Sequence, residues 1–242
     1  MSHERTLWLR PALRWHVIQA AIAWRRARTY LEIGVGNADT FCRIMAPRRL
    51  GVDPVAPAEL VCRERHQGLV RFFAMTSDEF FARHGDVLRD GGIDVAFIDG
   101  LHTHEQSLID VRHCLEYLNE RGLILVHDCN PTSEAMAAPA SSYDEAAGNS
   151  RSGSVVEWTG DVWKTIVHLR ALAEDLSVAV LDCDYGIGAV VKRPTRQRLS
   201  LGAETIRSWA YRDLEANRKE LLNLQPPQLL FKMLGEGPAK SG

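Results

Sequence analysis

One stretch near the start of the sequence decides the fold, and it reads Leu31-Glu32-Ile33-Gly34-Val35-Gly36-Asn37-Ala38-Asp39-Thr40. An apolar run typical of a buried strand leads directly into two glycines. Glycines at a turn from a strand into a helix let the backbone approach a ligand closely. Asp39 stands where the dinucleotide pattern G-x-G-x-x-G has its last glycine or alanine, which argues against a dinucleotide site.

Two carboxylates accompany this turn. Glu32 lies two residues before the first glycine, and Asp53 ends the next apolar run, 19 residues after Gly34. In nucleotide-binding α/β folds, an acid at the end of the second strand accepts hydrogen bonds from ribose hydroxyls. The spacing therefore predicts a cofactor that contains a nucleoside.

Short β-rich runs alternate with helical patterns through the first half of the chain. Ser77 is expected to cap one helix, and the helix that starts after Thr103 is expected to end at Gly122. This alternation predicts a doubly wound α/β fold, with a mostly parallel sheet covered by helices on both faces. The expected strands are Tyr30–Ile33, Leu50–Asp53, Val70–Ala74, Asp94–Ile98 and Leu123–His127.

The chain is expected to have three parts. Residues 1–28 form an N-terminal helical segment, residues 29–193 the core domain, and residues 194–242 a C-terminal helical segment and tail. Within the core, Leu176–Asp182 and Ile187–Lys192 are expected to form an antiparallel C-terminal hairpin. Residues 131–160 are rich in Ala, Ser, Gly and Pro, and we interpret them as a lid loop.

The composition of the chain excludes several classes of protein. The 242 residues are 45% hydrophobic and carry a formal charge of −2, which is typical of a globular protein and gives no electrostatic reason to expect a nucleic-acid partner. No apolar run reaches the roughly 18 residues of a membrane span. Five scattered cysteines do not fit a disulfide framework, and the N-terminus lacks a signal peptide, so a cytoplasmic location is expected. The tryptophan-rich N-terminal segment and the C-terminal helices are expected to bury a homo-oligomer interface.

Acids and histidines follow the fourth and fifth strands. Asp99 and His102 come after one strand, and His127 and Asp128 after the next. Ligands bind beyond the carboxyl ends of parallel strands, where these side chains should converge. Two carboxylates lie close together only when a cation or a shared proton intervenes. The residues thus predict either a divalent metal on Asp99, Asp128 and His127, or a metal-free site in which His102 or His127 is the general base.

These motifs resemble those of class I S-adenosylmethionine-dependent methyltransferases. Glu32-Ile33-Gly34-Val35-Gly36 is similar to the first motif of that family, and Gly51-Val52-Asp53-Pro54 to the second. The resemblance covers roughly residues 28–193, and it implies a seven-stranded, Rossmann-like sheet whose last strand is antiparallel. The strand ends that contain Asp99 and Asp128 are similar to those of small-molecule, metal-dependent O-methyltransferases.

The resemblance also implies roles for individual residues. Gly34 and Gly36 would pass beneath the methionine part of S-adenosylmethionine, Asp53 would hold the ribose, and Glu32 and Asp99 would also bind the cofactor. Residues near the adenine would be Thr76, Ser77 and Asp78. The catalytic residues would be Asp99, His102 and His127, and the metal, Mg²⁺ or Mn²⁺, would be bound by Asp99, Asp128 and His127.

The expected function is methyl transfer from S-adenosylmethionine to a small molecule, at a hydroxyl group and with possible help from a metal. Two alternatives stay open: a nucleotide-dependent oxidoreductase, and a methyltransferase-like module that binds a partner without catalysis. Sugars, phenols, catechols, polyketides and amino-acid derivatives are all open as acceptors, as is methylation of nitrogen or carbon.

Overall fold

The structure is a computed structural model that describes residues 12–57, 69–142, 144–146, 157–195 and 197–235. Residues 1–11 of the N-terminal segment, part of the expected lid loop and the last residues of the tail lie outside these ranges. Within them, no helix combines the length and the apolar character that crossing a membrane requires.

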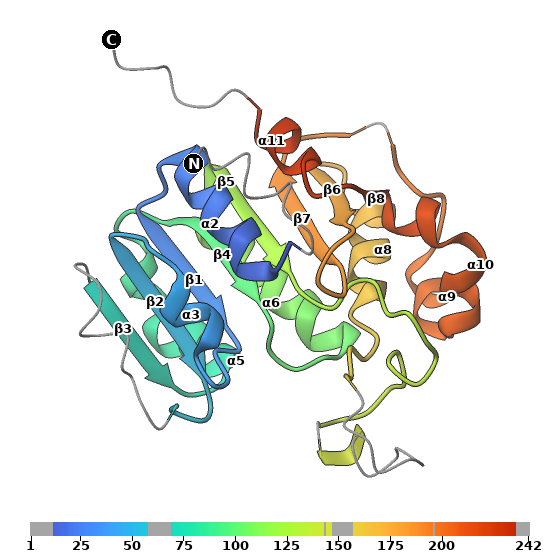
Figure 1. Ribbon diagram of the computed structural model, residues 1–242, viewed down its shortest axis with the longest axis horizontal. Coiled ribbons are helices and arrows are strands. Elements are labelled where there is room, and N and C mark those ends of the chain that lie inside the picture. Colours follow the sequence, from blue (N-terminus) through green and yellow to red (C-terminus); the bar gives the residue numbers. More distant parts are fainter. Residues whose placement is uncertain (1–11, 58–68, 143, 147–156, 196, 236–242) are drawn as a thin grey trace.

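The described strands form one sheet of eight, in the order β3-β2-β1-β4-β5-β7-β6-β8 (Figure 1). Pairing is parallel from β3 through β5, antiparallel on both sides of β7, and parallel between β6 and β8. The strands are β1 (Thr29–Ile33), β2 (Arg48–Asp53), β3 (Leu69–Ala74), β4 (Ile93–Ile98), β5 (Leu118–Val126), β6 (Leu176–Leu181), β7 (Ile187–Lys192) and β8 (Leu224–Gln225). The predicted α/β fold and its antiparallel hairpin are confirmed, and the two-residue edge strand β8 adds to the seven strands expected.

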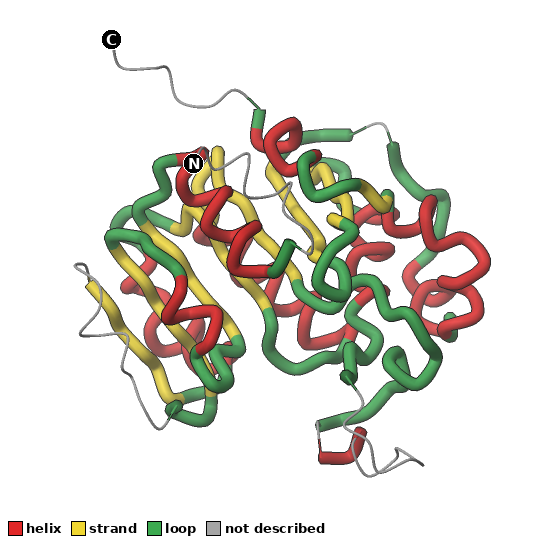
Figure 2. The backbone as a smooth tube through the Cα atoms, viewed as in Figure 1, coloured by secondary structure: helices red, strands yellow, loops and turns green. Residues whose placement is uncertain are grey.

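Helices cover both faces of the sheet (Figure 2). The helices α2, α3 and α11 pack on one face, and α5, α6, α8, α9 and α10 pack on the other. Their bounds are α2 (Arg14–Arg25), α3 (Asp39–Arg43), α5 (Ser77–His84), a 3-10 turn η1 (Gly85–Leu88), α6 (His104–Tyr117), α8 (Trp163–Leu172), α9 (Ala203–Ser208), α10 (Tyr211–Leu222) and α11 (Leu229–Leu234).

The central strands are apolar because both of their faces are buried. In β1, Leu31 and Ile33 pack toward α5 and α6, whereas Tyr30 packs toward α2 and α3. Strands covered on both sides read as continuous apolar runs rather than as alternating ones. That character made the central strands easy to recognise in the sequence.

Two helix boundaries differ from the prediction. The helix α6 ends at Tyr117 rather than at Gly122, because β5 already begins at Leu118 and pairs with Ile93. Gly122 lies instead where the register between β4 and β5 shifts, and an irregular strand tolerates glycine there. The cap of α5 is Thr76 rather than Ser77: the Thr76 hydroxyl accepts a hydrogen bond from the backbone N–H of Glu79.

The cysteines also differ in part from expectation. Cys114, Cys129 and Cys183 carry free thiols, as expected for a chain without a disulfide framework. Cys42, on α3, is disulfide-bonded, which the scattered cysteine spacing did not predict.

The glycine turn is the point where the architecture positions the site. Gly34 has a left-handed backbone with φ of +83°, and a Cβ atom there would lie 2.0 Å from the backbone oxygen of Asp99. The two strand ends are also joined by a 2.8 Å hydrogen bond from the Asp99 N–H to the Ile33 carbonyl. Absence of a side chain at position 34 therefore lets the end of β1 lie against the end of β4.

This contact predicts different costs for the two glycines. Gly36 is also left-handed, with φ of +53°, but nothing lies within 4 Å of a Cβ placed there. Gly36→Ala should therefore lower the free energy of unfolding by only about 1–2 kcal/mol, the usual cost of a left-handed side chain. Gly34→Ala should cost a further 1–3 kcal/mol, roughly, because it also overpacks the Asp99 backbone. Urea denaturation of both variants measures the difference, and equal losses would contradict the contact.

Candidate active site

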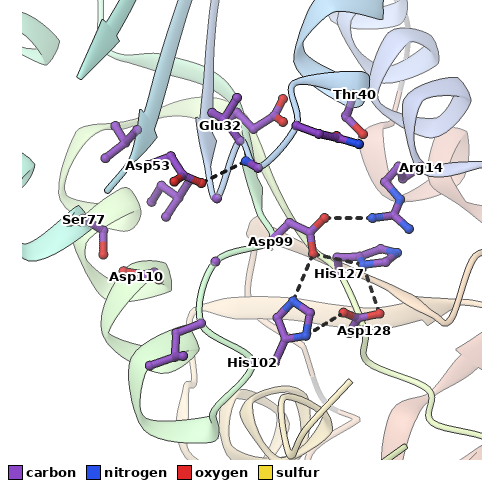
Figure 3. Close-up of a pocket in the computed structure, with 18 of the residues that line it drawn as sticks. Arg14, Glu32, Thr40, Asp53, Ser77, Asp99, His102, Asp110, His127 and Asp128 are labelled. Carbon is purple, nitrogen blue, oxygen red and sulfur yellow. Dashed lines mark hydrogen bonds and ion pairs between the residues drawn. The ribbon is translucent and has the colours of Figure 1, made fainter. Parts of the chain in front are cut away.

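All the residues predicted to bind ligands line one cavity at the carboxyl ends of the parallel strands (Figure 3). The cavity has a volume of about 1290 Å³. Its lining includes Glu32, Gly34, Gly36, Asp53, Thr76, Ser77, Asp78, Asp99, His102, His127 and Asp128. The glycine turn and the acid–histidine cluster, which consists of Asp99, His102, His127 and Asp128, therefore lie in a single cavity.

At the glycine turn, Asp53 is held by the backbone. One carboxylate oxygen accepts a 2.9 Å hydrogen bond from the Gly36 N–H, and the other accepts a 2.8 Å hydrogen bond from the Val55 N–H. A carboxylate has about four acceptor positions. Asp53 can thus fix the turn and still accept hydrogen bonds from a ligand.

A polar group from α5 and α6 forms another wall. The Gln106 amide donates to Ser77, Asp78 and Asp110 at 3.3, 3.2 and 3.1 Å. Burial raises the pKa of Asp110 to about 6, although its hydrogen bonds with Ser77 and Gln106 oppose the shift. Gln106 and Asp110 were not predicted as site residues, because they are two of several polar residues on α6 and no local pattern distinguishes them.

Glu32 lies beneath the turn with only 1% of its surface exposed. Its carboxyl group accepts a hydrogen bond from the Tyr30 hydroxyl. Burial raises the pKa of Glu32 to about 8, despite the opposing effect of the Tyr30 hydrogen bond. Glu32 is therefore mostly protonated at neutral pH, so it offers a ligand a neutral carboxyl group.

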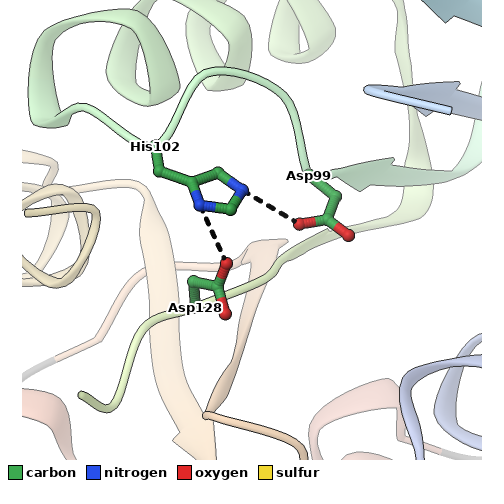
Figure 4. Close-up of side chains that lie close together, drawn as sticks. All are labelled: Asp99, His102 and Asp128. Atoms are coloured by element: carbon green, nitrogen blue, oxygen red, sulfur yellow. Dashed lines mark ion pairs between the residues drawn. The ribbon is translucent and has the colours of Figure 1, made fainter. Parts of the chain in front are cut away.

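At the other end of the cavity, two carboxylates flank an imidazole (Figure 4). His102 Nε2 lies 3.6 Å from Asp99 Oδ1, and His102 Nδ1 lies 3.3 Å from Asp128 Oδ2. One ligand atom from each of these three residues lies within 4.8 Å of the others, an arrangement that could hold a metal ion. Among the described residues, this is the one group of three or more such side chains that meets that criterion.

His127 lies deeper, with 2% of its side chain exposed. Its Nδ1 atom is 3.1 Å from Asp99 Oδ1 and 3.0 Å from Asp128 Oδ1. Burial alone would lower the pKa of His127, but the charges of Asp99 and Asp128 outweigh it and raise the pKa well above its usual range. A protonated ring has no lone pair, so His127 would have to lose a proton before it could serve as base or ligand.

The conformation of His102 is fixed by the segment before α8. His102 Nδ1 lies 2.7 Å from the Trp158 carbonyl oxygen, which a ring N–H can reach as donor. Burial lowers the pKa of His102, yet the nearby carboxylates of Asp99 and Asp128 raise it above the usual value. The Trp158 indole in turn donates to the Ala138 carbonyl at 2.8 Å, so an earlier part of the expected lid loop holds the part that contacts His102.

Two further charged residues of this site were not predicted. Arg14, at the start of α2, and Asp184, in the turn between β6 and β7, both line the cavity. Arg14 Nη1 lies 2.8 Å from Asp99 Oδ2. Arg14 is 85 positions from Asp99 and 170 positions from Asp184 in the sequence, and no local sequence pattern indicates that these residues meet.

Comparison with known proteins finds a family model that matches part of the chain. Residues 17–129 match a family model described as a methyltransferase domain. The matched part contains the glycine turn, Asp53 and the acid–histidine cluster. Together with the sheet topology, the match supports a class I S-adenosylmethionine-dependent methyltransferase.

Solved structures are similar at low sequence identity. The O-methyltransferase from Bacillus cereus, in complex with SAH, is 16% identical; the alignment covers 72% of this chain and 79% of that chain, with a TM-score of 0.47. Cofactor-bound Rv0187 from MTB is 15% identical over 80% of this chain and 87% of that chain, with a TM-score of 0.49. No curated protein sequence matches the chain.

The burial of Glu32 predicts a pH dependence of stability. The pKa of Glu32 is about 8 in the folded protein, whereas an unfolded chain releases this proton near pH 4.5. Unfolding between these values releases a proton, so stability should fall as pH rises, by at most about 1.4 kcal/mol per pH unit from this group. Glu32→Gln should flatten that fall in urea denaturation between pH 5 and 8.5.

The exposed Glu116 provides a control, because Glu116→Gln removes a carboxylate of the same length from the surface of α6. Its pH profile should follow that of the wild type. A Glu32→Gln profile parallel to the wild type would show that Glu32 is ionised in the folded protein.

Proposed function

We propose that the protein transfers a methyl group from S-adenosylmethionine to a hydroxyl group of a small molecule. The observation that carries this proposal is the shared cavity. A glycine turn with a fixed carboxylate stands at one end, and Asp99, His102 and Asp128 converge at the other. Such a cavity can hold the cofactor and an acceptor side by side, which is what direct methyl transfer requires.

The cofactor would lie along the first two strand ends. Asp53 would accept the ribose hydroxyls, while Gly34 and Gly36 leave room for the methionine part above the turn. The polar wall of Thr76, Ser77 and Asp78 would face the adenine. Glu32, neutral and buried under the turn, would offer a hydroxyl donor rather than a second negative charge.

His102 is the residue that we propose takes the proton of the acceptor. With Nδ1–H directed to the Trp158 carbonyl, a neutral His102 carries its lone pair on Nε2. That atom lies beside Asp99, and His102 lines the cavity. A neutral imidazole is suited to general-base catalysis near neutral pH. Deprotonation matters because a hydroxyl group is a weak nucleophile.

Asp99 and Asp128 would also hold a divalent cation. Their carboxylates fit such an ion because they converge within 4.8 Å of one another and of an imidazole nitrogen. Carboxylate oxygens suit Mg²⁺ or Mn²⁺. When bound, the cation would lower the pKa of the acceptor hydroxyl and hold its oxygen in place.

A transfer assay tests the proposal. Purified protein is incubated with radiolabelled S-adenosylmethionine and a panel of phenols, catechols, sugars and hydroxylated polyketides. We expect transfer to at least one hydroxyl, loss of activity in EDTA, and recovery with Mg²⁺ or Mn²⁺. His102→Gln should lower the rate by about 10²–10⁴-fold, the usual contribution of a general base. His84→Gln, a substitution outside the cavity, should leave the rate unchanged.

The possible results separate the alternatives. Full activity in EDTA together with the His102→Gln defect would leave His102 as a metal-free base and remove the cation from the account. Binding of NAD(H) without binding of S-adenosylmethionine would favour an oxidoreductase. Cofactor binding without transfer to any acceptor of the panel would favour the non-catalytic module.

A further inference from the structure

Arg14 reaches into the acid cluster from the first turn of α2 (Figure 3). Its Nη1 lies 2.8 Å from Asp99 Oδ2. Its Nε and Nη2 donate to the two carboxylate oxygens of Asp184 at 3.1 and 3.2 Å. The Arg14 backbone N–H also donates to Asp184 at 2.6 Å, so Asp184 caps the first turn of α2, where Leu13 offers no capping side chain.

Asp184 is itself firmly held. It lies in the β6–β7 turn with only 7% of its side chain exposed. Asp184 and Tyr185 both have left-handed backbones, with φ of 44° and 58°, a conformation that costs energy for residues with a side chain. The Cys129 and Asn130 N–H groups donate to the Gly186 and Tyr185 carbonyls, which ties this turn to the segment that follows Asp128.

The fixed position of Arg14 determines how the Asp99 carboxylate is oriented. Arg14 occupies Oδ2 of Asp99, and the other oxygen, Oδ1, faces His127 and His102. A guanidinium is planar and binds in a fixed fork, so its contacts with Asp184 determine where its remaining N–H groups point. An arginine fixed in this way selects one orientation of the Asp99 carboxylate.

We propose that Arg14, anchored by Asp184, is a positioning residue that holds Asp99 with Oδ1 directed at His102 and the acceptor end of the cavity. Arg14, at the start of α2, and Asp184, in the C-terminal hairpin, both lie outside the matched residues 17–129 and would thereby complete the active site. This inference rests on the proposed function for what Asp99 does, and on geometry alone for how Asp99 is held.

A rival explanation is that Arg14 only offsets the negative charge of the cluster. The two explanations predict opposite changes in cation binding. Loss of a counter-charge would tighten the binding of a divalent cation, whereas loss of a positioning contact would weaken it. Arg14→Lys separates them further, because lysine keeps the charge and lacks the planar fork.

The experiment titrates Mn²⁺ into the SAH-bound full-length protein and its variants, followed by electron paramagnetic resonance. We expect Arg14→Gln, Arg14→Lys and Asp184→Asn each to weaken Mn²⁺ binding by about 10–100-fold, the usual effect of removing a residue that orients a ligand. The affinity for SAH, measured by calorimetry, should change by less than about twofold, which also reports that each variant is folded. Arg43→Gln is the matched control: it removes a positive charge from the same cavity, and Mn²⁺ binding should not weaken.

Crystal structures of the SAH-bound wild type and Arg14→Lys provide a readout that needs no metal. We expect the Asp99 carboxylate to rotate away from His102 in the variant. An unchanged Asp99 would overturn the proposal, as would tighter Mn²⁺ binding in Arg14→Gln with wild-type binding in Arg14→Lys. If the wild type binds no Mn²⁺, the cation in the proposed function fails, and the orientation of Asp99 still decides the role of Arg14.

Discussion

The contact between Gly34 and the Asp99 backbone is the constraint on which the rest of the site depends. The glycine turn follows β1, and the first acid of the cluster, Asp99, follows β4. They can touch because position 34 has no side chain: a Cβ atom would lie 2.0 Å from the Asp99 oxygen. Asp99 therefore lies directly beside the turn. The backbone contact between the ends of β1 and β4 thus positions both ends of the cavity.

The charges of the cluster balance through pairing across distant elements. Three carboxylates, Asp99, Asp128 and Asp184, converge on two side chains that carry a positive charge, Arg14 and His127. Burying these charges is costly, and mutual pairing offsets much of that cost. Removing one partner leaves an unpaired charge in a largely buried place. The cluster thus links α2, the ends of β4 and β5, and the β6–β7 turn into one unit.

Much of the fold could be predicted from the sequence because its signals are local. The buried strands are short apolar runs, the glycine turn has a distinctive spacing, and the hairpin lies around a Gly186 turn. The end of α6 could not be predicted, because pairing of Leu118 with Ile93 decides it, and that pairing joins segments 25 residues apart. Gly122 was predicted to end a helix, but it lies in β5, where the register with β4 shifts.

Some residues of the site could likewise be predicted from the sequence, and others could not. Asp53, Asp99, His102 and Asp128 could be located because strand ends in a parallel sheet meet at one edge. Arg14 and Asp184 could not, since only the folded chain brings the start of α2 against the β6–β7 turn. The charge state of His127 was equally inaccessible, because it depends on the positions of two carboxylates around a buried ring.

A crystal structure of the complex with S-adenosylhomocysteine tests the central claim most directly, namely that the glycine turn and the acid–histidine cluster serve a single cofactor-and-acceptor cavity. We expect both ribose hydroxyls on the Asp53 carboxylate, the amino acid part above Gly34 and Gly36, and the sulfur directed toward Asp99 and His102. A nucleoside bound away from Asp53, or a sulfur atom that faces away from the cluster, would contradict the account.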